Sequence, residues 1–240
     1  MTTAPPSGLR PLPGVAHRTA ALADLQPGEL MLHELYRSLQ GESTYAGLPC
    51  VFVRTAVCNL RCRWCDTPYS FPKGTRRPRA EVLAEVLAFD TPLVELTGGE
   101  PLLQADAFPL MAELCGAGKT VLLETGGSLA VDAVDPRVHI IMDLKCPDSG
   151  ESGSNLWGNL DVLKRTDEVK FVIASRGDWD WAFDAIRRHR LGERFTVQVS
   201  AAFGQVALKD LAEWILESRL NVRLQLQAHK YIWDPKARGV

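Results

Sequence analysis

Three cysteines, Cys58, Cys62 and Cys65, lie within eight residues in the spacing Cys-x3-Cys-x2-Cys. Four thiolates normally bind a ferredoxin-type iron–sulfur cluster. Three thiolates leave one iron of a 4Fe–4S cluster without a protein ligand, and an open metal position is what metal-based catalysis requires. The spacing therefore indicates a catalytic cluster.

A structural zinc site or a set of inert thiols is the alternative reading of these cysteines. A structural zinc site needs four ligands, and His33 or Cys146 is a candidate for the fourth, but no second Cys/His pair has ligand spacing. Inert buried thiols are not expected beside Asn59, Arg61 and Asp66. Both observations favour the cluster.

S-adenosylmethionine can fill the open iron position through its amino and carboxylate groups. Electron transfer into the sulfonium then releases a 5′-deoxyadenosyl radical, with the protein supplying geometry and exclusion of water. The segment Thr97-Gly98-Gly99-Glu100-Pro101 suits such a cofactor. Its glycines allow close backbone approach, and its carboxylate can pair with an ammonium group. Taken alone, the same segment is typical of a turn that opens a helix.

The elements that must position these residues alternate between short apolar strands and amphipathic helices. Strands are predicted at 50–57, 92–97, 120–123, 138–142, 169–174, 195–199 and 222–226, with helical periodicity between most of them. This alternation predicts an α/β fold with a parallel sheet. About 210 residues lie outside the N-terminal tail, fewer than the roughly 250 of a full eight-fold barrel. We therefore expect an incomplete parallel (β/α) barrel of about six strands.

Polar residues follow several of these strands. Because sites in parallel α/β folds form at the carboxyl ends of strands, these residues should share one rim with the cysteines. As further S-adenosylmethionine contacts we predict Glu124, Thr125, Asp143, Lys145, Gln198 and Ser200.

Composition limits the remaining possibilities. The chain has 240 residues, 46% of them hydrophobic, and a formal net charge of −2, which favours a single small-molecule enzyme domain over a nucleic-acid or membrane-surface binder. No apolar run is long enough for a membrane span or a signal peptide, so a cytoplasmic location is expected. Residues 1–29, rich in Pro and Gly, are predicted to be a flexible extension, and 30–240 the catalytic domain.

The cysteine spacing, with Trp64 before the last cysteine and Gly98-Gly99-Glu100 downstream, resembles the radical S-adenosylmethionine superfamily. The resemblance implies that Trp64, Asp66 and the glycine-rich segment contact the cofactor. Four further segments, covering residues 30–235 in order, look like the 7-carboxy-7-deazaguanine synthase family. They are Leu39-Gln40-Gly41-Glu42-Ser43, Arg54, Asp66-Thr67-Pro68-Tyr69-Ser70 and Gln227-Ala228-His229-Lys230-Tyr231.

That resemblance implies a carbon–nitrogen lyase in queuosine and 7-deazapurine biosynthesis. The family converts 6-carboxy-5,6,7,8-tetrahydropterin to 7-carboxy-7-deazaguanine with loss of ammonia. The radical abstracts hydrogen from C6, the ring contracts, and the hydrogen returns, so S-adenosylmethionine is used catalytically. The resemblance also implies Mg²⁺, a homodimer, and a reducing donor such as flavodoxin or ferredoxin.

The matching positions give this chain's expected ligands. Thr67 would bind Mg²⁺, a hard cation that suits oxygen ligands; a cap before Pro68 is its alternative. Arg54 can grip a carboxylate with its planar fork, and Glu42 can accept from the pterin's donor edge. For His229 a solvated side chain is the alternative. The expected substrate residues are Gln40, Gly41, Glu42, Arg54, Thr97 and His229.

Two other functions compete with this interpretation. A glycyl-radical-enzyme activase shares the small barrel and the cysteine spacing, but has no use for Gln-Gly-Glu or Asp-Thr-Pro. An iron–sulfur or zinc binding module predicts four protein ligands. The chain also departs from the family, because it continues past Pro235 to Val240. We therefore do not expect a terminal carboxylate to act at the site.

Overall fold

The computed structural model describes residues 15–72 and 74–240. Within these residues one sheet has nine strands, in the order β3-β1-β2-β4-β5-β6-β7-β8-β9. The strands are β1 (Glu29–Leu39), β2 (Pro49–Thr55), β3 (Thr75–Pro78), β4 (Leu93–Gly98), β5 (Thr120–Thr125), β6 (His139–Asp143), β7 (Glu168–Ile173), β8 (Thr196–Ala201) and β9 (Arg223–Leu224).

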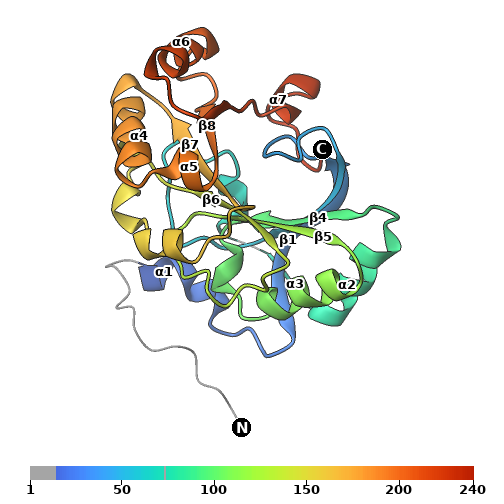
Figure 1. The fold of residues 1–240 in the computed structure, drawn as a ribbon. Coiled ribbons are helices and arrows are strands. Elements are labelled where there is room, and N and C mark those ends of the chain that lie inside the picture. The colour runs from blue at the N-terminus through green and yellow to red at the C-terminus, as the bar shows by residue number, and fades with distance from the viewer. Residues whose placement is uncertain (1–14, 73) are drawn as a thin grey trace.

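From β2 to β9 every neighbouring pair is parallel, and the ribbon curves into an incomplete barrel (Figure 1). The predicted α/β architecture is confirmed. The sequence missed β1 and β3, which pair antiparallel at one edge. Strand β1 was not recognised because only Leu30, Met31 and Leu32 are buried in it, while the rest is half-buried or exposed and forms no apolar run.

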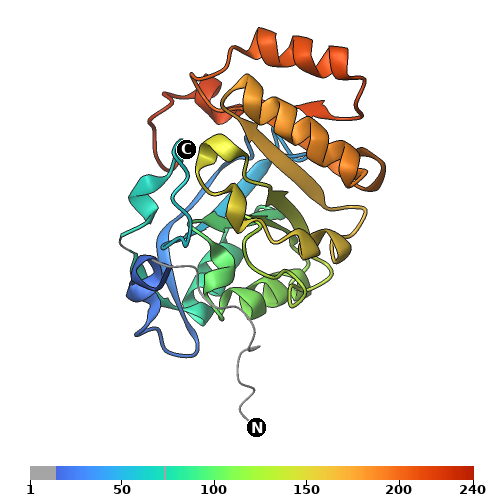
Figure 2. The same ribbon diagram turned by 90° about the vertical axis from the view of Figure 1, so that its left-hand side faces the viewer.

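Most of the helices cover the outer face of this sheet (Figures 1 and 2). Their apolar faces pack on the outward-facing strand residues to form the main hydrophobic core, as expected for βα units. The helices are α1 (Val15–Thr19), α2 (Arg79–Ala88), α3 (Ala107–Gly116), α4 (Arg176–Arg188), α5 (Leu191–Arg194), α6 (Leu208–Ser218) and α7 (His229–Ile232); 3₁₀ turns span Ala20–Leu22, Pro68–Ser70, Pro101–Leu103, Pro147–Ser149, Ser152–Ser154 and Trp157–Asp161. None of the described helices has both the length and the apolar character that a membrane span requires.

The inner face of the sheet changes from apolar to polar along the strands. Cys50, Phe52, Leu93, Leu122 and Ile141 form a small separate apolar cluster there. Because side chains alternate along a strand, the residues two positions further on point to the same face. Those positions hold Arg54, Glu95, Glu124 and Asp143. Charged side chains of the strands therefore point to the inner face of the sheet.

The described part of the N-terminal segment is ordered and packed, unlike the flexible extension expected over 1–29. Residues 15–22 form α1 and a 3₁₀ turn, and Leu22 and Leu25 pack on a cluster that includes Val57. Arg18 donates to the Asn59 carbonyl oxygen at 2.9 Å. Residues 1–14 of the predicted extension lie outside the described residues.

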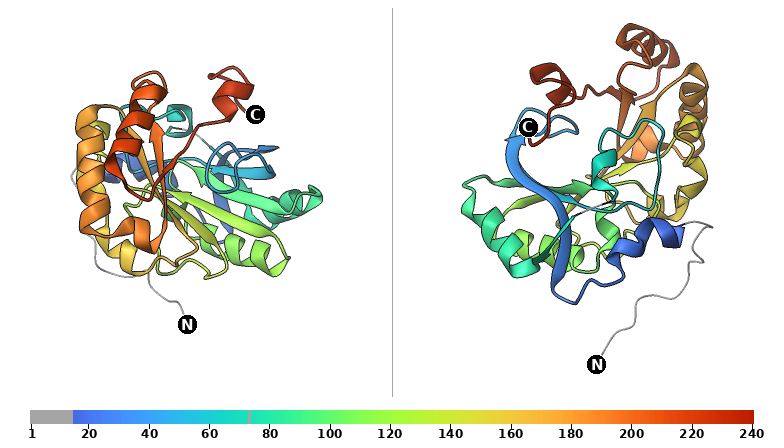
Figure 3. Two further views of the ribbon diagram at one scale, coloured as in Figure 1. Left: turned by 45° about the horizontal axis from the view of Figure 1, so that its top comes forward. Right: turned by 180° about the vertical axis from the view of Figure 1, so that it is seen from behind.

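The C-terminal segment lies beside the loop that follows β1 (Figures 1 and 3). The backbone N–H of Ala228 donates to the Gly41 carbonyl oxygen at 2.9 Å. A Cβ on Gly41 would approach His229 Nδ1 to 2.3 Å. Gly41 is therefore the residue whose missing side chain lets α7 come this close.

Candidate active site

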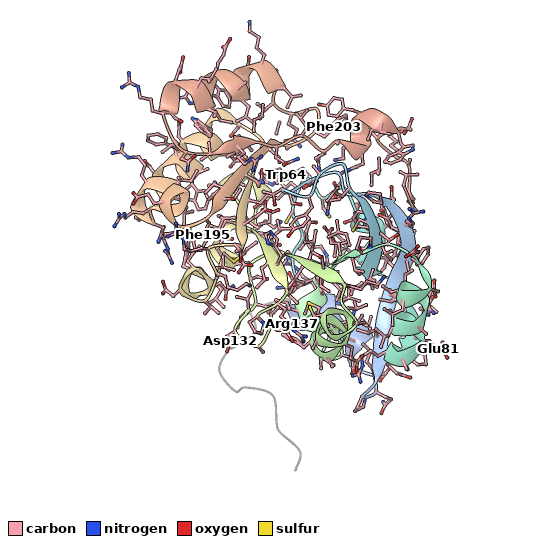
Figure 4. All side chains as sticks on the ribbon, turned by 45° about the vertical axis from the view of Figure 1, so that its right-hand side comes forward. Trp64, Glu81, Asp132, Arg137, Phe195 and Phe203 are labelled. Atoms are coloured by element: carbon pink, nitrogen blue, oxygen red, sulfur yellow. The ribbon has the colours of Figure 1, made fainter. Side chains whose placement is uncertain are left out.

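One cavity of about 470 Å³ occupies the inner side of the sheet, a size typical of small-molecule sites. Trp64 and Phe203 line it and lie toward one end of the molecule, away from Arg137 and Asp132 (Figure 4). Nearly all predicted site residues line this cavity: Gln40, Gly41, Glu42, Arg54, Cys58, Cys62, Trp64, Cys65, Asp66, Thr67, Thr97, Gly98, Gly99, Glu100, Glu124, Thr125, Asp143, Lys145 and His229. Their individual roles stay predictions.

The loop of residues 58–66, here called the cluster loop, leaves β2 through a strained residue. Val57 has φ of 74°, which is unusual for a β-branched residue. Its N–H donates to the Ser70 carbonyl oxygen and its own carbonyl oxygen accepts from Glu100 N–H, both at 2.9 Å. These bonds hold the sharp turn that carries Cys58 from the strand end into the cavity.

Three thiols in this spacing suit a 4Fe–4S cluster with one open iron. Among the described residues, no three His, Cys, Asp or Glu side chains are close enough to ligate one ion. A cluster does not need such closeness, because each thiolate binds a different iron. Burial raises the pKa of the Cys58 thiol to about 12, so the free thiol is protonated at neutral pH and cluster loading must displace its proton.

The glycine-rich segment packs backbone against backbone on the cluster loop. A Cβ on Gly99 would lie 2.0 Å from the Val57 carbonyl oxygen, so only glycine fits. Glu100 is fully buried and accepts from Gly126 N–H at 2.8 Å, Leu102 N–H at 3.1 Å and the Thr125 hydroxyl at 3.0 Å. A cofactor ammonium would compete with these three donors for Glu100.

The residues predicted to contact S-adenosylmethionine at later strand ends divide into two groups. Lys145 and Asp143 line the cavity and pair at 2.7 Å. Asp143 Oδ1 is buried without a hydrogen-bond partner, which is expected where a ligand or water completes the site. Gln198 and Ser200 are buried on β8 but do not belong to the cavity wall, and Gln198 donates to Glu168 at 2.7 Å.

A second group of polar and charged residues, which sequence reasoning missed in part, lines the same cavity. We call Gln40, Glu42, Glu95, Glu124 and Lys170 the inner network. Lys170 pairs with Glu42 and lies 3.6 Å from Glu124; Gln40 donates to Glu95. The available signal was a charge inside an apolar strand, as in Val169-Lys170-Phe171 and Val94-Glu95-Leu96.

Two members of the inner network, Gln40 and Glu42, come from the loop that precedes β2, whereas Glu95, Glu124 and Lys170 lie on strands. Leu39 pairs with Pro49 at the start of β2, so Gln40 emerges there. The cluster loop begins beyond Thr55, the last residue of β2. Of the later strand-end residues expected on one rim with the cysteines, Glu124, Thr125, Asp143 and Lys145 line the cavity, whereas Gln198 and Ser200 do not.

The remaining predicted ligands are held in place by neighbours. Arg54 donates to Glu34 at 2.7 Å and to the Tyr36 hydroxyl at 2.9 Å. The Thr67 hydroxyl makes no capping hydrogen bond to the 3₁₀ turn that follows it, so the cap alternative has no support. Burial lowers the pKa of His229, which favours its neutral form.

The C-terminal residues also line the cavity, among them Asp234, Arg238 and Val240. Arg238 stacks over the Tyr69 ring at 4.2 Å. Sequence reasoning assigned these residues no part in the site. Their placement shows that the segment after Pro235 forms part of the cavity wall.

Comparisons with known proteins agree with this geometry. Residues 52–191 match the model of the Radical SAM superfamily. A protein from Chlorobaculum tepidum named 7-carboxy-7-deazaguanine synthase is 49% identical over 214 residues, which cover 88% of this chain and 97% of that protein. Proteins of the same name from Koribacter versatilis and Thermoplasma acidophilum are 46% and 39% identical, covering 88% and 85% of this chain and 100% and 97% of their own lengths.

The fold is also similar to a solved structure. The crystal structure of QueE from Escherichia coli superposes with a TM-score of 0.68 at 18% identity and covers 88% of this chain and 98% of its own. At that identity the likeness concerns the fold, and it supports the incomplete barrel.

Proposed function

Because this chain belongs to the radical S-adenosylmethionine superfamily and, within it, to the 7-carboxy-7-deazaguanine synthase family, we propose that it forms 7-carboxy-7-deazaguanine from 6-carboxy-5,6,7,8-tetrahydropterin. Ammonia leaves as the ring contracts, so the enzyme acts as a carbon–nitrogen lyase. Family membership implies a 4Fe–4S cluster and S-adenosylmethionine, which together supply a carbon-centred radical when bound.

One observation carries the proposal: a single cavity holds Cys58, Cys62 and Cys65 together with Glu42 and Arg54. The three thiols fit a cluster with one open iron. Glu42 and Arg54 fit the two polar features of the pterin, an aminopyrimidinone edge rich in N–H donors and a carboxylate. Substrate and cofactor can therefore share one cavity.

The chain's own residues bind and orient in this scheme. The Arg54 guanidinium, fixed by Glu34 and Tyr36, would grip the substrate carboxylate. Lys145 would meet the carboxylate of S-adenosylmethionine, and the unpartnered Asp143 oxygen would accept a hydrogen bond from a ligand. Neutral His229 would offer one ring N–H and one acceptor nitrogen to the pterin.

Mg²⁺ belongs to the same proposal, with Thr67 as its protein ligand. Thr67 lines the cavity, and its hydroxyl has only a 3.8 Å contact with Cys65 Sγ. A hydroxyl together with a substrate carboxylate suits a cation that keeps several waters. We expect Thr67→Ala to blunt the activation by added Mg²⁺ while leaving the cluster's absorbance unchanged. An unaltered Mg²⁺ response would remove Thr67 from the metal site.

A homodimer, a cytoplasmic location and a flavodoxin or ferredoxin as electron donor complete the proposal and rest on family resemblance and sequence composition. The glycyl-radical activase is not favoured, because relatives that span most of this chain carry the synthase name.

The proposal is tested by anaerobic reconstitution with iron and sulfide, reduction, and addition of S-adenosylmethionine, Mg²⁺ and the carboxylated tetrahydropterin. We expect 7-carboxy-7-deazaguanine by mass spectrometry. Formation of 5′-deoxyadenosine without any deazapurine would contradict the assigned substrate but retain the radical chemistry. A correctly loaded cluster that never cleaves S-adenosylmethionine would contradict both.

A further inference from the structure

Lys170 is a lysine of β7 that lines the cavity and is almost fully buried. Its ammonium pairs with Glu42 Oε2 and lies 3.6 Å from Glu124 Oε1. A buried ammonium is costly unless it is paired. Here the partner of the ammonium is Glu42, which under the proposed function binds the substrate.

Both carboxylate oxygens of Glu42 are held from within the protein. Lys170 binds Oε2, and Gln227 Nε2 donates to Oε1 at 2.8 Å. The Glu42 backbone N–H donates to Gln40 Oε1 at 3.0 Å, which fixes the loop itself. A carboxylate has about four acceptor positions, so each Glu42 oxygen keeps one for a ligand. Two parallel N–H donors of a flat heterocycle match that remaining pair.

The charge around Glu42 is mostly negative. Acidic groups face it from two strands and the cluster loop: Glu95 on β4, Glu124 on β5, and Asp66. The cations on the cavity wall are Arg54, Lys145, Lys170, Lys230 and Arg238, with His229 beside them. Of the described cations, only Lys170 forms an ion pair with Glu42.

The pKa directions agree with this geometry. Burial alone would raise the pKa of Glu42, but the charge of Lys170 and the hydrogen bonds from Lys170 and Gln227 together outweigh burial, and the pKa lies below its usual value. Glu95 forms no ion pair with a described cation, and burial with the neighbouring carboxylates raises its pKa well above the usual value. The two glutamates share one cavity and differ in their access to Lys170.

We propose that Lys170 is a positioning residue for substrate recognition, which holds Glu42 as an ionised, oriented acceptor for the N–H donor edge of the heterocyclic substrate. This inference rests on the proposed function. Lys170 acts through Glu42 and need not touch the substrate. Gln227 fixes the other carboxylate oxygen of Glu42, so both acceptor oxygens are oriented before the substrate binds.

The test measures equilibrium binding of the carboxylated tetrahydropterin to reconstituted holoenzyme with S-adenosylmethionine, between pH 6 and pH 9. Lys170→Met removes the charge and keeps most of the volume. Without Lys170, burial and the neighbouring carboxylates raise the Glu42 pKa, so protonation extends to higher pH. We expect binding at least about tenfold weaker than wild type near pH 6, with recovery as pH rises. Lys170→Arg should restore the wild-type pH profile in part.

Lys164→Met is the matched control. Lys164 pairs with the buried Asp167 at 2.9 Å but does not line the cavity. The Lys164→Met variant should be less stable than the wild type, but the pH profile of pterin binding should stay the same. A pH-independent loss in Lys170→Met, like that of a purely structural defect, would overturn the proposal, and so would unchanged binding.

A double-mutant cycle keeps the proposal testable if Lys170→Met folds poorly. In a Glu42→Gln background, position 42 carries no charge for Lys170 to hold. Adding Lys170→Gln to that background should change the affinity for the pterin less than about threefold. When Glu42 is present, Lys170→Gln should weaken it at least about tenfold. Equal effects in the two backgrounds would overturn the proposal. If wild-type holoenzyme cleaves S-adenosylmethionine but does not bind the pterin, the proposed function fails instead.

Discussion

The metal-binding groups of the cavity come from a single loop, whereas the charged and polar groups of the inner network come from separate elements. Cys58, Cys62 and Cys65 lie within eight residues. The inner network takes its members from the β1–β2 loop, β4, β5 and β7. A cluster of fixed chemistry can be bound by a short motif, whereas a particular heterocycle needs donors and acceptors whose positions depend on the register of several strands. The cluster loop and the inner network should therefore respond differently to substitution.

Cys62→Ala should have the largest effect, and that effect should be confined to the binding of the iron–sulfur cluster. Three thiolates are the minimum for a cluster with one open iron, so we expect folded protein without the cluster's visible absorbance and without turnover. The matched control is Cys115→Ala, whose thiol is half-buried and outside the cavity; it should load iron normally. Wild-type turnover by Cys62→Ala would refute the assigned ligand.

Gly99→Ala should come next, because the added Cβ would meet the Val57 carbonyl oxygen at 2.0 Å and cannot be relieved by a side-chain movement. We expect a loss of about 2 kcal/mol or more in the free energy of unfolding, with reduced cluster content. Gly116→Ala, with no atom within 4 Å of its added Cβ, should be neutral or slightly stabilising. Equal melting temperatures for the two variants would contradict the tight packing at Gly99.

Arg54→Lys should affect the substrate and spare the cluster. An ammonium cannot reproduce the planar fork that Glu34 and Tyr36 orient, so the KM for the pterin should rise about tenfold with normal iron content. Arg176→Lys, at an exposed pair with Asp180, serves as the control. If KM stays at the wild-type value, Arg54 does not bind the substrate carboxylate.

Arg18→Ala should have the smallest effect, and the property affected should be the retention of the bound cluster. Arg18 joins the Asn59 carbonyl oxygen and Glu151, each at 2.9 Å, and Glu151 also accepts from Arg61 N–H at 2.7 Å. A partly exposed pair contributes about 1 kcal/mol or less. We expect two- to threefold faster cluster loss under a chelator, on the order of 0.5 kcal/mol. The control is Arg190→Ala at an exposed surface pair. Identical rates in both would show that the N-terminal segment does not brace the cluster loop.

What the sequence could predict follows the same division. The cysteine spacing and Gly98-Gly99 were recognised because their partners are close in the chain or are backbone atoms. The parallel strands were recognised from their buried apolar runs. The predicted Glu42 and Arg54 reach the cavity, but their internal partners were not predicted.

The missed features depend on contacts between distant segments. Lys170 reads as an isolated charge in β7 until pairing brings β7 beside β6 and β8. Arg18 finds its partners only when α1 packs under the cluster loop. Strand β1 has a buried apolar run of only three residues because it lies near the sheet's edge, where most of its length is partly exposed. Hydrophobic periodicity in a sequence indicates which side chains are buried. It therefore cannot reveal the partners of Lys170 and Arg18, or a strand that is mostly exposed.

The most direct test of a single cavity that serves both cofactor and substrate is isotope transfer. The pterin is labelled with deuterium at C6 and turned over anaerobically, and the S-adenosylmethionine is recovered and analysed by mass spectrometry. We predict deuterium in the 5′-deoxyadenosyl portion of recovered S-adenosylmethionine, together with 7-carboxy-7-deazaguanine. Product formation with fully unlabelled S-adenosylmethionine and 5′-deoxyadenosine would contradict the account.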